Sequence, residues 1–385
     1  MTKRDAKDEK KAPKLRFKGF TDDWEQVPLE NIIKVNSGRD YKFANPGDIP
    51  VYGTGGYMLS IDTKLSDEDA VGIGRKGTIN KPFFLKAPFW TVDTIFYLTS
   101  RNQNNIHFLL PLFQKINWKR YDESTGVPSL SKSTINKIRV NIPKIEEQRN
   151  VALLFQSLDH TITLHEEKQK QLEQLKKALL QKMFADKSGY PKVRFKGFSE
   201  PWEQVKFGKI TSKYKTRNKD GEELRSFSVS NIYGFIPQEE QFENGGIALN
   251  ADKKNSIIVT PNSFAYNPAR INVGSIGYYN GNENVLVSSL YEVFKLHKEY
   301  DPNYLWFWLK SNHFNWWIHR LQEGSVRSYF YYDKFSEIKE RMPSLPEQMK
   351  IGQLLKSLDH TITLHAKKIE SLKQLKQALL QQMFI

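Results

Sequence analysis

The sequence predicts an α+β fold in which two globular domains follow each other in tandem, separated and held by two long helices that form an antiparallel coiled coil with pseudo-two-fold symmetry. Three observations predict this architecture. The segment LRFKGFTDDWEQV at 15–27 returns as VRFKGFSEPWEQV at 193–205, an offset of 178. The nonapeptide SLDHTITLH at 157–165 returns unchanged at 357–365, an offset of 200. Between these flanks the two bodies differ strongly, so the chain consists of two half-chains, of which the second is longer by 22 residues.

The long helices are predicted over residues 145–186 and 345–385. Residues 145–184 contain no Gly or Pro and are rich in Leu, Gln, Lys, Glu and Ala, which favour helix. Apolar side chains recur at alternating spacings of four and three in both copies, as in a coiled-coil seam. About 40 residues would form a helix of roughly 60 Å. The residues predicted to pack in the seam are Leu158, Ile162, Leu172, Leu179, Leu358, Ile362, Leu372 and Leu379.

Polar residues interrupt this seam at His165, Gln169 and Lys176. We expect them to set the register and the orientation of the helix pair. Pairing of the two helices within one chain is favoured over pairing with another chain, because both partners share one polypeptide. Three further apolar residues widen the stripe and indicate a second contact face: Leu164, Leu175 and Leu180.

The domain boundaries follow from these segments. Residues 1–14 alternate Lys with Asp and Glu without apolar anchors and are predicted to be a disordered tail. The first globular domain is then expected at 15–144 and the second at 187–344. Short runs of Val, Ile, Phe, Tyr and Thr punctuated by Gly, Asn and Pro predict α/β or mostly β domains, with short helices near 104–118 and 302–321.

The composition favours a polyanionic partner. The chain carries 58 Lys and Arg against 43 Asp and Glu, a net charge of +15, and bound cations displace the counterions condensed on phosphates. A basic protein without a nucleic-acid role is the alternative that charge alone leaves open. The absence of cysteine excludes disulfides and thiol nucleophiles and suits the reducing cytoplasm, where we expect the chain. The sequence predicts neither a membrane span nor a secretory signal.

The motifs of common catalytic sites are missing. The sequence has no P-loop, and the G-I-G-R-K-G run at 72–77 lacks the helical periodicity that should follow a dinucleotide-binding turn. The nearest match to an Asp/Asn-Pro-Pro-aromatic methyltransferase motif, Asn267-Pro-Ala-Arg270, lacks its second Pro and its aromatic residue. His160 and His165 lie five residues apart, which is poor spacing for a metal on a helix. We therefore predict no catalytic residue, no metal site and no cofactor bound by this chain.

One loop region in each domain is a candidate for DNA binding. Glycines allow close backbone approach, Arg and Lys can contact phosphate or guanine, and Asn can read adenine. Ordinary solvated charges are the alternative for any single residue. In the first domain the candidates are Tyr52, Thr54, Tyr57, Arg75, Lys76, Thr78, Asn80, Lys81, Ser129 and Lys132. In the second they are Asn267, Arg270, Asn272, Ser275, Ser325, Arg327, Tyr329 and Tyr331.

Several of these motifs resemble one known family. The F-K-G-F-x-x-x-W-E-Q-V segment, the junction that places Glu147 and Gln148 after Pro143, and the S-L-D-x-x-I helix ending in L-L-Q-x-M-F resemble the specificity subunit of Type I restriction-modification enzymes. The runs IGRKGT at 73–78 and NPARINVGSIG at 267–277 also look like parts of its target-recognition domains. The resemblance covers nearly the whole chain.

The resemblance implies a division of labour. Each target-recognition domain would read one half of a bipartite asymmetric DNA site, and the helices would set the gap. They would also dock two DNA adenine methyltransferase subunits, which bring S-adenosylmethionine. Restriction and translocase subunits would add ATP and Mg²⁺. Two other hypotheses remain open from the sequence: an enzyme that cuts or methylates DNA by itself, and a coiled-coil scaffold that binds nucleic acid non-specifically by charge.

Overall fold

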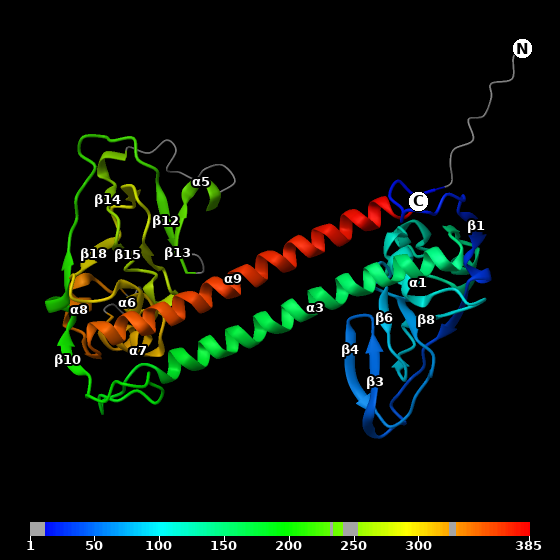
Figure 1. The fold of residues 1–385 in the computed structure, drawn as a ribbon, viewed down its shortest axis with the longest axis horizontal. Helices are drawn as coiled ribbons and strands as arrows, with labels where there is room; N and C mark the ends of the chain where they lie inside the picture. The colour runs from blue at the N-terminus through cyan, green and yellow to red at the C-terminus, as the bar shows by residue number, and fades with distance from the viewer. Residues whose placement is uncertain (1–11, 232–233, 242–252, 323–328) are drawn as a thin grey trace, which may run out of the picture. The chain divides into compact units, whose positions relative to one another are not determined.

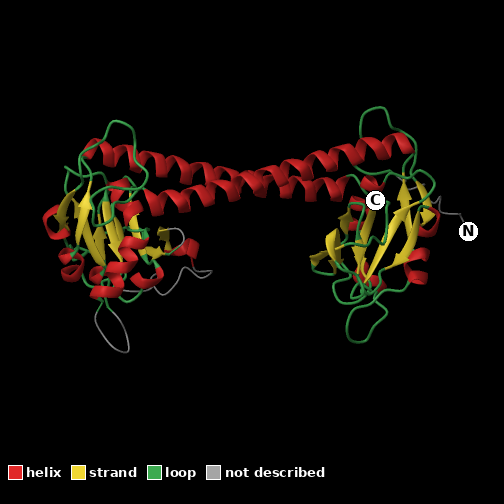
Figure 2. Cartoon of the chain, turned by 90° about the horizontal axis from the view of Figure 1, so that it is seen from below, coloured by secondary structure: helices red, strands yellow, loops and turns green. Residues whose placement is uncertain are grey.

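The computed structural model describes residues 12–231, 234–241, 253–322 and 329–385. Of the predicted disordered tail, 1–14, residues 1–11 lie outside the described residues. The chain forms two compact units, one of residues 1–167 with 366–385 and one of residues 168–365. Each unit contains one globular domain, called a head below, together with parts of both long helices. Figure 1 labels the elements, and Figure 2 shows the strands gathered within the heads.

The first head is built on three sheets. The largest has the order β2-β8-β5-β6, the second β4-β3-β7, and β1 pairs with β9. The strands are β1 (Glu25–Pro28), β2 (Ile33–Ser37), β3 (Pro46–Gly53), β4 (Gly56–Ile61), β5 (Ala70–Gly74), β6 (Phe83–Leu85), β7 (Trp90–Thr91), β8 (Ile95–Ser100) and β9 (Arg139–Ile142). The helices are α1 (Ile106–Lys115) and α2 (Lys132–Lys137), with 3₁₀ turns η1 (Leu29–Asn31) and η2 (Trp118–Tyr121).

The second head repeats this plan with a four-stranded sheet of order β11-β18-β15-β16 and three two-stranded sheets, β10-β19, β12-β13 and β14-β17. The strands are β10 (Glu203–Lys206), β11 (Thr211–Lys213), β12 (Phe227–Ser230), β13 (Gly234–Pro237), β14 (Ile257–Val259), β15 (Ser263–Tyr266), β16 (Ile276–Tyr279), β17 (Val285–Val287), β18 (Glu292–Leu296) and β19 (Lys339–Met342). The helices and turns are α4 (Phe207–Ile210), α5 (Gln238–Gln241), η4 (Lys253–Asn255), η5 (Ile271–Val273), α6 (Pro302–Trp308), α7 (Asn312–Leu321) and α8 (Tyr332–Glu337).

The two four-stranded sheets correspond strand by strand. In the first head β2 pairs with β8, β8 with β5, and β5 with β6. In the second head β11 pairs with β18, β18 with β15, and β15 with β16. The small sheets correspond as well, because Val27 faces Val140 in β1-β9 just as Val205 faces Glu340 in β10-β19. The duplication seen in the sequence is therefore a duplication of topology, although the two bodies differ in sequence.

The long helices are α3 (Ile145–Lys182) and α9 (Leu345–Gln382). In the first unit the Lys376 ammonium lies 2.5 Å from the Asp159 carboxylate, and Lys373 lies 2.7 Å from Glu166. From Asp159 to Glu166 the residue number rises along α3, while the number of the paired lysine on α9 falls from 376 to 373. The two helices therefore run antiparallel there. In the second unit Lys176 forms the equivalent ion pair with Asp359.

The fold class predicted from the sequence is thus confirmed, with an antiparallel helix pair in each unit. The seam residues also lie inward. Ile162, Leu358 and Leu372 are buried, and the other five are partly buried. Of the polar seam residues, Lys176 makes the ion pair just described.

Each helix ends inside the core of a head. Met183 and Phe184, just after α3, are buried with Trp202 and Tyr304 in the second head. Met383 and Phe384, just after α9, are buried with Trp24 and Phe108 in the first. The backbone amide of Val193 donates to the Lys182 carbonyl at 2.9 Å, and the amide of Leu15 donates to the Gln382 carbonyl at 3.0 Å. The Met and Phe of the L-L-Q-x-M-F sequence therefore form part of the core of a head.

A buried ion pair fastens the start of each long helix to the F-K-G-F segment. The Glu147 carboxylate is almost fully buried and accepts two hydrogen bonds from the Arg16 guanidinium, at 2.8 and 2.7 Å, and one from the Trp24 indole at 3.3 Å. The bond to Glu147 raises the pKa of Arg16. Glu347, Arg194 and Trp202 repeat the arrangement in the second head. We call each set an Arg–Glu–Trp clamp.

The glutamine that follows each clamp glutamate fixes the next helix of the head. The Gln148 side chain accepts from the Asn105 amide at 3.0 Å, just before α1, and donates to the Pro143 carbonyl at 3.0 Å. Gln348 bonds in the same way to the Asp301 amide and the Pro343 carbonyl. The repeated Pro, Glu and Gln thus each take part in hydrogen bonds that stabilise the heads.

We expect Glu147→Ala to destabilise the first unit by about 3–5 kcal/mol, because it leaves the buried Arg16 guanidinium without its counterion. Hydrogen exchange of peptides from each head, followed in increasing denaturant, measures this effect. Peptides of residues 15–144 should exchange faster, and those of the second head should not change. Adding Arg16→Met to Glu147→Leu should recover most of the loss. If Glu147→Ala changed the exchange rate of peptides from both heads by the same amount, the role of the clamp would be contradicted.

Candidate nucleic-acid interface

The basic loop of the first head connects two neighbouring strands of the main sheet. β5 ends at Gly74, and residues 75–82 lead into β6. A Cβ at Gly74 would lie 2.2 Å from the Thr78 carbonyl oxygen, so the turn requires glycine at this position. Arg75, Lys76, Asn80 and Lys81 are exposed, whereas Thr78 is half-buried. The loop therefore presents three cationic side chains and one amide on a short, fixed backbone.

A second segment closes over the base of this loop. The Gly77 amide donates to the Pro128 carbonyl at 2.8 Å, and the Leu130 amide donates to the Arg75 carbonyl at 3.0 Å. Lys76 and Ser129 form an isolated β-bridge. Lys132 is exposed at the start of α2, two residues beyond Leu130. The structure thus brings together Arg75, Lys76, Ser129 and Lys132, which the sequence placed in separate segments.

Asp122 organises that second segment, and the sequence analysis did not select it. Its carboxylate accepts hydrogen bonds from the amides of Ser129 at 2.9 Å and Ser124 at 3.0 Å. These bonds keep the pKa of Asp122 below its ordinary value. An Asp two residues before a Ser in a Gly- and Pro-containing loop is a signal for such a turn, but the contact to Ser129 depends on the folded loop.

The remaining first-head candidates lie on the β3-β4 hairpin. The ring of Tyr52 contacts that of Tyr57, with centroids 6.4 Å apart, and that of Phe83, at 6.1 Å. Phe83 begins β6 directly after the basic loop. Thr54 lies in the turn between β3 and β4 and is partly buried. The hairpin and the basic loop are therefore neighbours within the first head.

The candidate loop of the second head occupies the equivalent position, between β15 and β16. The Asn267 carboxamide oxygen accepts from the Ala269 amide at 3.0 Å, which leaves its NH₂ group as a donor. Arg270 and Asn272 are exposed. Ser275 is buried instead, and its hydroxyl donates to the Val229 carbonyl at 2.8 Å. The same place in the two folds thus carries Arg, Lys and Asn in one head and Asn and Arg in the other.

A tyrosine pair adjoins this second loop. The Phe330 amide donates to the Pro268 carbonyl at 3.1 Å, as the Leu130 amide does to Arg75 in the first head. The flanking Tyr329 and Tyr331 rings stack with centroids 5.6 Å apart and planes inclined by 5°. Tyr331 is exposed. The candidates Ser325 and Arg327 lie outside the described residues.

A small cavity of about 240 Å³ opens beside the second loop. Apart from Val229 and Val273, its lining is formed by serine and asparagine side chains with one arginine and one tyrosine: Ser228, Ser230, Asn231, Asn267, Arg270, Ser275 and Tyr291. Asn231 and Tyr291 were not selected from the sequence. Nothing in their local sequence distinguishes them, because they reach the loop only through the pairing of β12 and β18 with their neighbours.

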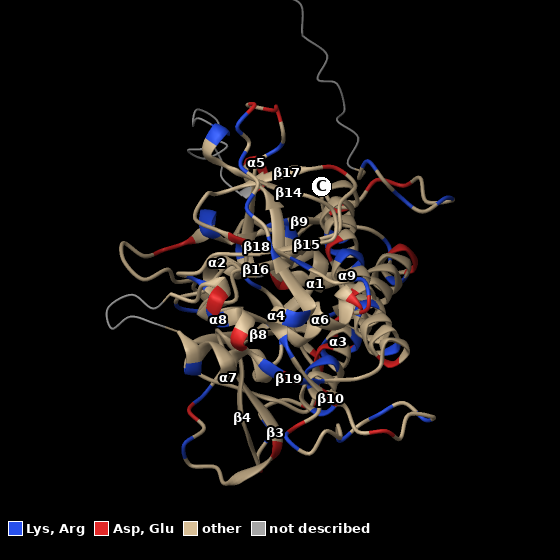
Figure 3. Ribbon diagram, turned by 90° about the vertical axis from the view of Figure 1, so that its left-hand side faces the viewer, with Lys and Arg blue, Asp and Glu red and all other residues tan. Residues whose placement is uncertain are grey.

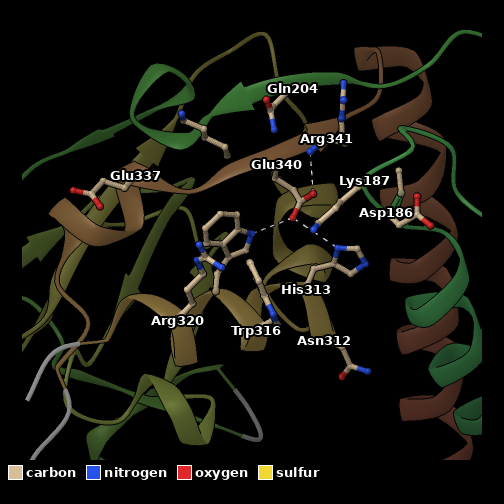
Figure 4. A pocket seen from close by; sticks show the side chains of 13 residues that line it. Asp186, Lys187, Gln204, Asn312, His313, Trp316, Arg320, Glu337, Glu340 and Arg341 are labelled. Carbon is tan, nitrogen blue, oxygen red and sulfur yellow. Dashed lines mark hydrogen bonds and ion pairs between the residues drawn. The ribbon is translucent and has the colours of Figure 1, made fainter. Parts of the chain in front are cut away.

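A larger cavity of about 870 Å³ lies elsewhere in the second head, against α7 and β19 (Figure 4). The buried Glu340 carboxylate accepts from the Trp317 indole at 3.3 Å and lies 3.7 Å from the His313 ring nitrogen. At its edge, the Arg320 guanidinium lies 5.2 Å from the half-exposed Trp316 ring. The residue equivalent to Glu340 in the first head is Val140. The scaffold therefore does not require a carboxylate at this position.

Charge alone does not single out one face. Figure 3 shows Lys and Arg interspersed with Asp and Glu along the loops and helices. Over the parts of the chain that the structure describes, no three His, Asp or Glu side chains come close enough to hold a metal ion. None of the helices in these ranges is long and apolar enough to span a membrane. The paired loops are the feature that most directly suggests a ligand.

Comparison with known proteins identifies the architecture. The chain matches the family of Type I restriction modification DNA specificity domains twice, over residues 21–174 and 199–374. The chain belongs to this family. Each match includes one head and most of the helix that follows it, so each half-chain is one copy of the family's domain.

A curated relative agrees with this assignment, and solved structures allow the fold to be compared. The Type I restriction enzyme MjaVIII specificity subunit of Methanocaldococcus jannaschii is 22% identical, over 93% of this chain and 91% of its own length. The crystal structure of the Type I restriction-modification S subunit from M. genitalium superposes with a TM-score of 0.67 at 13% identity, covering 97% and 99% of the two chains. The HsdS subunit from Thermoanaerobacter tengcongensis gives 0.45 at 14% identity, covering 94% and 96%. The M. genitalium structure shares the fold of this specificity subunit over its whole length.

Two substitutions test the basic loop of this specificity subunit. Arg75→Ala should weaken binding by about 1–3 kcal/mol and relax the choice of base at one position, if Arg75 reads a base edge. Lys76→Ala should weaken binding to all sequences alike and reduce the slope of log affinity against log salt by about 1, if it contacts phosphate. Fluorescence anisotropy with duplexes over a range of salt measures both effects.

Lys144→Ala is the matched control, because this exposed lysine of the first head pairs with Asp22 at 2.6 Å instead of lying in the loop. It should bind as the unaltered chain does. If Arg75→Ala and Lys76→Ala also bind unchanged, the loop does not contact DNA.

Proposed function

We propose that this chain reads DNA sequence for a Type I restriction-modification complex, with each head recognising one half of a bipartite asymmetric site. The observation that carries the proposal is the pair of equivalent loops. Both connect a central strand to the neighbouring edge strand of matching sheets and are closed by a matching backbone hydrogen bond, yet one exposes Arg75, Lys76 and Lys81 and the other exposes Arg270 and Asn272. Shared scaffolds with different exposed donors suit the reading of two different sequences.

The chemistry of the complex would belong to partner subunits. We expect two DNA adenine methyltransferase subunits to bring S-adenosylmethionine for N6-adenine methylation. Restriction and translocase subunits would use ATP and Mg²⁺ to cut unmodified DNA. The chain itself would not catalyse a reaction, and it would bind no cofactor of its own. The helices would set the gap between the half-sites.

The helices also offer a surface on which two identical partners could dock. Four residues of the repeated SLDHTITLH are exposed in both copies: Ser157, His160, Thr163 and Leu164, with Ser357, His360, Thr363 and Leu364. Packing within the chain does not explain why these exposed residues are identical. Exposed neighbours differ between the copies, such as Gln156 and Lys356, or Leu153 and Gln353. Identity of these exposed residues in both copies favours a partner that binds both copies in the same way.

Sequencing of N6-methyladenine in cells with and without this gene tests the reading function. We expect one bipartite motif to be methylated only when the gene is present. Replacing loop 75–81 with the corresponding loop of another specificity subunit should change one half of the motif and leave the other half and the gap unaltered. Binding of equal strength to all sequences would instead support a non-specific scaffold.

Docking is tested by Leu164→Asp and Leu364→Asp, each of which places a charge on an exposed apolar position. Each variant alone should retain about one methyltransferase subunit per complex, and the double variant should retain none, as measured by native mass spectrometry of the co-expressed subunits. Leu153→Gln is the matched control, because it gives an exposed leucine of α3 the residue found in α9. Retention of two subunits by the double variant would refute this docking site.

A further inference from the structure

The β3-β4 hairpin of the first head presents an uncharged, apolar tip. No charged residue occurs from Ile49 to Ile61, and aspartates at 48 and 62 bracket this stretch. Within it, the Tyr57 side chain is 63% exposed and Met58 is 48% exposed. Large apolar side chains on a projecting loop of a chain with a net charge of +15 need a reason, because water is a poor environment for them.

The backbone of the hairpin is shaped to hold these side chains at its tip. Val51 pairs with Leu59 but Tyr52 pairs with Tyr57, so Met58 is an extra residue in β4 and forms a β-bulge. Bulges redirect side chains and twist the strand. A Cβ at Gly53 would lie 2.8 Å from the Met58 sulfur, so Met58 lies over a position that has no side chain. Gly56 in the turn has a φ of +104°, which favours glycine.

The base of the hairpin is firmly held, so the tip is presented by a rigid support. β3 pairs on its other side with β7, and the Val92 amide donates to the Tyr52 carbonyl at 3.0 Å. The Tyr52 ring contacts Phe83 at 6.1 Å, and Phe83 follows the basic loop after Pro82. The apolar tip is thereby fixed to the element that carries Arg75, Lys76 and Lys81.

Duplex DNA offers both phosphates and apolar base surfaces. An apolar tip beside a basic loop therefore fits duplex DNA better than it fits a ligand that is only anionic or only apolar. The cations can neutralise phosphates, whereas the Tyr57 ring and the Met58 side chain carry no charge for a phosphate. The apolar parts of a duplex are the stacked base faces and the thymine methyl groups. Proteins that bend DNA push apolar side chains between base steps and partly unstack them while cations hold the backbone.

We propose that the first head inserts Tyr57 and Met58 at a base step of its half-site and partly unstacks that step, so that it selects sequence by deformability as well as by base contacts. This inference rests on the proposed DNA-reading function. In the β12-β13 hairpin of the second head, the tip residues 232–233 lie outside the described residues, so the inference concerns the first head.

The experiment uses the full chain assembled with its partner subunits on the duplex whose motif methylation sequencing defines. 2-Aminopurine, an adenine analogue that brightens when it unstacks, replaces single adenines on either strand of both halves. The methylated adenine is omitted because a methyltransferase flips it out of the helix. We expect a several-fold rise in fluorescence at one step of the first half.

Tyr57→Ser combined with Met58→Ser should abolish this rise and weaken binding by about tenfold, the loss expected on removing a stacked ring. Tyr57→Phe should retain the rise. Leu290→Ser, at a position 75% exposed in the second head, is the matched control and should change neither result. Thermal unfolding and a footprint of the second half establish that the variants are folded, since both substituted side chains are largely exposed.

Protection of both halves in a footprint without a bright step would overturn this inference and leave the proposed function intact. So would a bright step that persists in the double variant, or loss of partner subunits from the double variant with unchanged fluorescence, which would mean that the tip docks on protein. Absence of sequence-specific protection in either half would overturn the proposed function, and this inference with it.

Discussion

The buried carboxylate at the start of each long helix is the contact on which the rest of the architecture depends. Glu147 and Glu347 lie almost wholly out of water, and each receives a guanidinium and an indole from a segment more than 120 residues earlier in the chain. A charge placed there without partners would strongly destabilise the fold. The clamp therefore fixes where the helix leaves the head. Because it is identical in both halves, both helices leave in the same local geometry whatever the loops contain.

The other end of each helix imposes a second constraint. Met383 and Phe384, just after α9, belong to the core of the first head, and Met183 and Phe184, just after α3, belong to the core of the second. Neither head is complete without a helix that begins elsewhere in the chain. The Lys–Asp pairs 376–159 and 176–359 then fix the sliding of one helix against the other within each unit. Variable loops can change on such a frame without moving the helices.

The duplication made most of this predictable, and its limits are equally physical. Repeated flanks and heptad spacing indicated both helices, the antiparallel pairing and the equivalence of the loops at 74–81 and 267–275. Apolar periodicity cannot show which lysine meets which aspartate, because that depends on register across two helices. The segment at 302–321 was expected to be helical and forms two helices, but its spacing did not show that Trp316 would be half-exposed. Asp122, Asn231 and Tyr291 were missed because folding, not sequence proximity, brings them to the loops.

Comparing the two halves also distinguishes residues with a structural role from residues with a role in recognition. One head alone would not allow this distinction. A residue that is buried and identical in both, such as Glu147, is explained by the scaffold. A residue that is exposed and identical in both, such as Leu164, is not, and it indicates something outside the chain that meets both halves alike. A residue that differs at an equivalent position indicates a task of one head alone. Glu340 belongs to this last class, because it is a buried carboxylate where the first head has Val140, and the scaffold tolerates either residue.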